Sequence, residues 1–113
     1  KTPKVTCAAI QGLKQEHDTF LKEGPSPEVL AMFDLGAASK TEHYEIAAYQ
    51  GLIEKARLMG QQQVVQLLQQ NLQQEEEMAR KVQQLGQQLG PQMIQRMGPS
   101  QAAQQQGTPQ VYP

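Results

Sequence analysis

Apolar residues recur at helical spacing along most of the chain, and glycine and proline divide this pattern into three segments. The first segment covers residues 7–21 and ends at residues 24–27, because two prolines within three residues cannot continue a helix. The pattern resumes at residues 27–59 and again at residues 62–89. No segment alternates with the period of a strand. The pattern therefore predicts an all-α protein.

The ends of the two long segments carry helix-terminating signals. Ser26 is a good N-cap residue, and Pro27 follows it at the first helical position, where its missing N–H costs nothing. Gly60 is a candidate C-cap of the second helix. Gly90-Pro91 is expected to end the third helix at Leu89, with residues 92–97 adding at most one further turn.

The connection between the two long helices has only two or three residues, which forces the helices to run antiparallel. We therefore expect residues 1–24 to form a leading segment with a short helix and residues 25–97 to form one antiparallel helical hairpin. Residues 98–113 hold three prolines among clustered Gln, a composition typical of a disordered tail.

Three carboxylates fall on the apolar seam of this hairpin. Glu42 and Glu45 lie three residues apart, so they are stacked on one face of the second helix. Glu75 falls on the seam of the third helix. An unpaired buried carboxylate costs several kcal/mol, so this placement requires a reason. The seam positions are Ala38, Glu42, Glu45, Ile46, Tyr49 and Ile53 in the second helix, and Leu68, Leu72, Glu75, Ala79 and Val82 in the third.

Counting from the reversal at Gly60 places Glu45 opposite Glu75, since each is fifteen residues away. The same count places Glu42 opposite Met78. Converging like charges are destabilising unless they are protonated, paired with a base or bridged by a cation. Helical bundles commonly solve this with iron or manganese held by inward Glu residues. A solvated Glu run with the register shifted by one residue is the alternative, and His43 and Glu76 are weaker candidate ligands beside the cluster.

Composition and net charge limit the classes of partner that this protein is expected to bind. The net charge is −1 and there is no Lys/Arg run, so neither nucleic acid nor an anionic membrane surface is an expected partner. No apolar run approaches the length of a membrane span, and we expect a cytoplasmic protein. Cys7 is alone, which excludes an internal disulfide. Only 38% of residues are apolar and there is no Trp, so we expect a small core that is shared with a partner.

Residues 40–49, with the sequence KTEHYEIAAY, closely resemble the third-helix signature of the YciF-like family of ferritin-like bacterial stress proteins. Residues 7–13 are similar to the crossover segment of that family, and residues 67–72 followed by Glu75 resemble its fourth helix. The resemblance covers about residues 4–89. It implies that the hairpin is the C-terminal half of a ferritin-like four-helix bundle with a carboxylate-bridged dimetal site.

By this resemblance, Glu42 and Glu45 match the two carboxylates that the third helix gives to the dimetal site, and Glu75 matches the first acidic residue of the fourth helix. Ala79 stands where the family usually has a further acidic residue. The first two helices of the bundle, which supply the remaining ligands, have no counterpart in this sequence. The chain is then a fragment of a longer protein, pairs with a separate N-terminal half, or associates with a second copy.

We therefore expect a ferritin-like stress-response protein with a complete or vestigial iron or manganese dimetal site, assembled with another chain or copy. The alternative is a metal-free helical oligomerisation or interaction protein that retains only the bundle fold. No enzymatic activity is predicted, because one chain supplies few ligands; a di-iron oxidase-like or peroxidase-like reaction is the activity that such a site would support.

Overall fold

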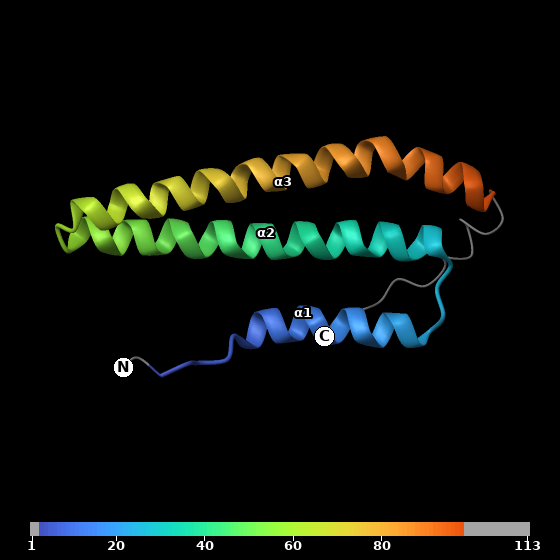
Figure 1. Cartoon of the computed structure of the whole chain (residues 1–113), viewed down its shortest axis with the longest axis horizontal. Coiled ribbons are helices and arrows are strands. Elements are labelled where there is room, and N and C mark those ends of the chain that lie inside the picture. The colour runs from blue at the N-terminus through green and yellow to red at the C-terminus, as the bar shows by residue number, and fades with distance from the viewer. Residues whose placement is uncertain (1–2, 99–113) are drawn as a thin grey trace.

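Three α-helices follow one another in a computed structural model that describes residues 3–98 (Figure 1). They are α1 (Ala8–Lys22), α2 (Pro27–Leu58) and α3 (Gln62–Met97). There is no strand within this range, which confirms the all-α prediction. The predicted disordered tail lies outside the described residues except for Gly98.

The sequence signals at both ends of α2 act as predicted. The Val29 backbone N–H donates a hydrogen bond of 3.3 Å to Oγ of Ser26, so Ser26 caps the helix ahead of Pro27. At the other end, Gly60 has a φ of 70°, a left-handed conformation that favours glycine. This turn lets α3 start at Gln62 and run back along α2.

The predicted end of α3 at Gly90-Pro91 is wrong, because the helix continues through Pro91 to Met97. Pro91 has no N–H to donate to Gln87, but both residues are exposed, so water can reach the carbonyl that is left free. Beyond the proline, Met97 is only 7% exposed. Its burial contributes about 1.5–3 kcal/mol, which offsets much of the roughly 3 kcal/mol that an interior proline costs a helix. Figure 1 shows α3 bending toward its C-terminal end.

The apolar core of the hairpin lies close to the reversal. Ile53 and Ala56 of α2 and Val65 of α3 are buried, and Leu68 and Leu72 pack against them. At the other end of the hairpin, Val29 and Met97 are the buried residues. The long middle of the hairpin between these two ends is only partly buried.

The short helix α1 lies along the N-terminal half of α2, on the other side of α2 from α3 in Figure 1. The rings of Phe20 and Phe33 stack with centroids 4.3 Å apart. Nε2 of His17 lies 3.1 Å from Oδ1 of Asp34, so the two helices are joined by an ion pair whenever His17 is protonated. Within residues 3–98, none of these helices is long and apolar enough to cross a membrane.

Candidate metal centre

The three carboxylates on the predicted seam do converge. Glu42 and Glu45 come from adjacent turns of α2, and Glu75 comes from α3 across the seam. One carboxylate oxygen from each residue lies within 4.8 Å of the other two. All three residues are half-buried. The register obtained by counting from Gly60 thus places Glu45 and Glu75 together, and Glu42 joins them.

Two of the three carboxyl groups have pKa values that their neighbours in the cluster raise. The pKa of Glu45 is raised, first by its hydrogen bond with Glu75 and then by partial desolvation and the Glu75 charge. The pKa of Glu75 is also raised, and its hydrogen bond with Glu42 is the largest cause. A hydrogen bond between two carboxyl groups needs a proton on one of them. Without a cation, Glu45 and Glu75 therefore retain protons more strongly than free carboxyl groups do.

One oxygen of the cluster has no hydrogen-bond partner among residues 3–98. Oε2 of Glu42 is buried, and no donor within the described part of the chain reaches it. None of the ion pairs between residues 3 and 98 involves Glu42, Glu45 or Glu75. A buried carboxylate oxygen without a donor is costly, and a cation at the cluster would satisfy it.

The donor set fits a hard divalent cation. Carboxylate oxygens suit manganese and, within helical bundles, the iron of dimetal sites. Three such residues supply fewer protein ligands than a complete dimetal centre, which takes inward side chains from four helices. The cluster therefore has the composition of part of a dimetal site.

The two weaker candidate ligands point elsewhere. His43 is exposed, and its Nδ1 lies 2.8 Å from the backbone carbonyl oxygen of Ser39, to which it donates in the corresponding tautomer. Glu76 follows Glu75 directly, so it projects about 100° around α3 from the cluster. The structure brings neither residue into the carboxylate cluster.

One contact of α1 was not predicted from the sequence. Sγ of Cys7, at the start of α1, lies 3.5 Å from Oη of Tyr44. The hydrogen bond with Tyr44 lowers the pKa of Cys7 and raises that of the phenol. The two residues are 37 positions apart, and no local pattern in the sequence signals that they meet.

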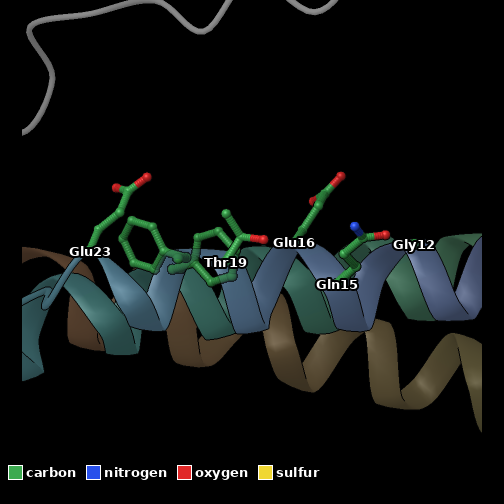
Figure 2. Close-up of a pocket in the computed structure, with 7 residues that line it drawn as sticks. Gly12, Gln15, Glu16, Thr19 and Glu23 are labelled. Atoms are coloured by element: carbon green, nitrogen blue, oxygen red, sulfur yellow. The ribbon is translucent and has the colours of Figure 1, made fainter.

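A surface hollow of about 320 Å³ lies between α1 and the start of α2 (Figure 2). Phe20 and Phe33 are the aromatic residues that line it, and Figure 2 shows the carboxylates of Glu16 and Glu23 pointing away from the helices. Glu16 is already paired with Lys40, whose Nζ lies 3.3 Å from its Oε2. None of the three cluster carboxylates lines this hollow.

The comparisons with known proteins give one family and one curated relative. The profile of a family described as "Domain of unknown function (DUF892)" matches residues 1–95. Protein YciF of Escherichia coli (strain K12) is 33% identical over 70 residues, which are 62% of this chain and 42% of that protein. The chain thus covers less than half the length of this relative. No solved structure matches the chain.

Proposed function

This chain belongs to the DUF892 family, and on that premise we propose that it is a ferritin-like protein whose Glu42, Glu45 and Glu75 bind iron or manganese. The similarity to Protein YciF agrees with the resemblance found in residues 40–49. The observation that carries the proposal is the buried, unpartnered Oε2 of Glu42 within a cluster of three carboxylates. A bound cation would accept that oxygen as a ligand. It would also oppose the raised pKa of Glu45, which has its hydrogen bond with Glu75 as the largest cause, followed by partial desolvation and the Glu75 charge.

Each residue has a definite role in this proposal. Glu42 and Glu45 present their carboxylates from successive turns of one rigid helix, which fixes their separation. Glu75 meets them from α3, with a carboxylate oxygen within 4.8 Å of one from each. A bound iron or manganese pair would supply redox chemistry, while the chain itself would bind the metal and hold it in a half-buried seam.

The remaining ligands would come from a second helical hairpin, which a longer form of this protein, a partner chain or a second copy would supply. The proposed setting is a bacterial stress response, as the family resemblance implies. An oxidase-like or peroxidase-like activity would need that second hairpin in place, because three carboxylates from one chain do not complete a dimetal site.

The test is a metal-binding measurement on the whole chain. The protein is prepared metal-free, titrated with Mn(II) or with Fe(II) under anaerobic conditions, and assayed for bound metal by elemental analysis and for thermal stability by circular dichroism. We expect bound metal and a higher melting temperature, because a ligand that binds only the folded state stabilises it.

Two double variants separate the cluster from ordinary surface carboxylates. Glu42→Gln with Glu45→Gln is expected to abolish metal binding and the metal-induced stabilisation. Glu54→Gln with Glu77→Gln removes the same charge from exposed positions and is expected to change neither. Equal metal binding by both variants would contradict the site. Absence of metal binding by the wild type would favour the alternative, a metal-free helical interaction protein.

A further inference from the structure

The surface hollow between α1 and the start of α2 combines negative charge with aromatic surface. Glu16 and Glu23 of α1 line it together with the rings of Phe20 and Phe33. Figure 2 shows the two carboxylates on the same side of α1, pointing away from the helices. None of the three cluster carboxylates takes part in this hollow, so its chemistry is separate from that of the candidate metal centre.

Helix α1 sets the spacing of the two carboxylates. Glu16 and Glu23 are seven residues apart, which is close to two turns, so they share one face of the helix. Their backbone positions are separated by about 10 Å along the helix axis. Phe20 stands between them, about one turn from each. The order along the hollow is therefore carboxylate, aromatic ring, carboxylate.

This spacing does not suit a single metal ion. The oxygens that bind one ion lie close together, as one oxygen each from Glu42, Glu45 and Glu75 does within 4.8 Å. Carboxylates that are two helical turns apart suit two positive charges instead, held apart by an apolar spacer. A linear aliphatic diamine or polyamine has this structure, because methylene chains separate its ammonium groups.

The protein already places one ammonium group at the Glu16 end of the hollow. Nζ of Lys40 lies 3.3 Å from Oε2 of Glu16, and the two side chains are 55% and 42% exposed. An ion pair this exposed contributes little to stability, so an incoming ammonium group can take the place of Lys40. At the other end, Glu23 is exposed, and none of the ion pairs between residues 3 and 98 involves it.

The aromatic rings are already fixed before a ligand arrives. Phe20 and Phe33 stack with centroids 4.3 Å apart, and both remain partly exposed. Methylene groups that cover this surface remove it from water, and an ammonium group near a ring face is attracted to it. Because the stacking holds the rings in place, a ligand loses less entropy in ordering them.

We propose that this hollow binds a linear aliphatic diamine or polyamine, with one ammonium group at Glu16, another at Glu23 and the methylene chain against Phe20. The ligand competes with Lys40 for Glu16. This binding needs no metal at the carboxylate cluster and is independent of the proposed metal function.

The experiment titrates the metal-free whole chain with two diamines and follows the backbone amides by NMR at low ionic strength. Hexamethylenediamine and trimethylenediamine carry the same charge, but only the longer one spans the two carboxylates. We expect hexamethylenediamine to bind with a dissociation constant on the order of 1 mM, because both ion pairs are exposed to water. The shorter diamine should bind at least about threefold more weakly, and the largest shift changes should lie at Gly12 and Thr19, which line the hollow.

Two matched pairs of variants test the contacts. Glu23→Gln should weaken hexamethylenediamine binding about fivefold and remove most of the preference for the longer diamine, whereas Glu54→Gln removes the same charge far from the hollow and should do neither. Lys40→Gln should strengthen binding about threefold, because it frees Glu16. Lys14→Gln removes the same charge from an exposed position of α1 outside the hollow and should have a smaller effect.

Circular dichroism checks that the four variants keep the helical content of the wild type. Equal affinity for the two diamines, or equal effects of Glu23→Gln and Glu54→Gln, would mean that the diamine responds to net charge alone and would overturn the site. Shift changes centred on Glu42 and Glu45 would place the diamine at the carboxylate cluster and would also overturn it. If Lys40→Gln bound no more tightly than Lys14→Gln, the assignment of an ammonium group to Glu16 would be wrong.

Discussion

Two levels of the same hairpin, about two helical turns apart along α2, are built in opposite ways. Near the reversal, Ile53 and Val65 meet in an apolar contact from which water is excluded. Further along the same seam, Glu45 and Glu75 meet with raised pKa values, beside an oxygen of Glu42 that no donor among the described residues reaches. The apolar level stabilises the fold by itself. The carboxylate level is favourable only when a cation or protons offset its negative charge. Helix packing and site formation therefore use the same geometry but contribute to stability with opposite signs.

The largest expected change in stability comes from truncating a buried side chain of the apolar core near the reversal. Ile53→Ala is expected to destabilise the metal-free chain by about 2–4 kcal/mol, because Ile53 is 5% exposed and the small core cannot refill the cavity. Urea unfolding monitored by circular dichroism measures the change. Leu58→Ala is the control, since Leu58 is 84% exposed and should change stability by less than about 0.5 kcal/mol. Equal effects of the two substitutions would refute the core assigned to Ile53, Ala56 and Val65.

Replacing a carboxylate of the cluster with an apolar side chain should stabilise the metal-free chain. Glu45→Leu in the metal-free chain is expected to raise stability by about 1 kcal/mol, because replacing a crowded carboxylate with an apolar side chain removes repulsion and desolvation. The same substitution should remove the stabilisation by Mn(II). Melting temperatures with EDTA and with Mn(II) give both values. A metal-free variant less stable than the wild type would mean that the cluster stabilises the seam without metal.

A smaller effect is expected from pH. The pKa values of Glu45 and Glu75 are raised in the folded state, so the folded chain binds more protons than the unfolded chain between the ordinary value of 4.5 and the raised values. The contribution of the cluster to stability therefore rises as the pH falls through this window and is least favourable above it. Melting temperatures of the metal-free wild type and of Glu45→Gln with Glu75→Gln, compared from pH 7 to pH 5, isolate this contribution. A difference between the two proteins that is independent of pH would contradict it.

The smallest effect is expected at the open end of the hairpin, which is stabilised locally. Ser26→Ala removes the cap on the Val29 N–H and should cost about 0.5 kcal/mol, since the hydrogen bond is long at 3.3 Å. Ser26→Asp keeps an acceptor at this position and should retain most of the stability. Chemical unfolding of the two variants measures the difference. A cost as large as that of Ile53→Ala would show that this end, and not the reversal, dominates the stability of the hairpin.

The sequence predicts the hairpin well because its signals are local. The cap at Ser26, the turn at Gly60 and the apolar periodicity each depend on a few neighbouring residues, and the register of Glu45 against Glu75 follows from them by counting. The helix break expected at Pro91 fails because burial of Met97, six residues further on, offsets a local penalty. Local propensity cannot include that contact.

The position of α1 could not be predicted for a related reason. The stacking of Phe20 on Phe33 and the contact of Cys7 with Tyr44 depend on how the chain turns between residues 22 and 27, and several directions are compatible with that composition. The absence of His43 from the cluster has a simpler cause. It lies next to Glu42 in the sequence, and neighbours on a helix diverge by about 100°.

The short turn at Gly60 also has a consequence for how this sequence can change over evolution. In most helical hairpins, a residue can be inserted into the connecting loop at little cost, because the loop is exposed. Here one inserted residue that lengthened the start of α3 would rotate every later position by about 100° and turn Glu75 away from Glu45. Insertions and deletions at residues 59–61 should therefore be selected against more strongly than substitutions there. The length of this loop should then be maintained together with the site.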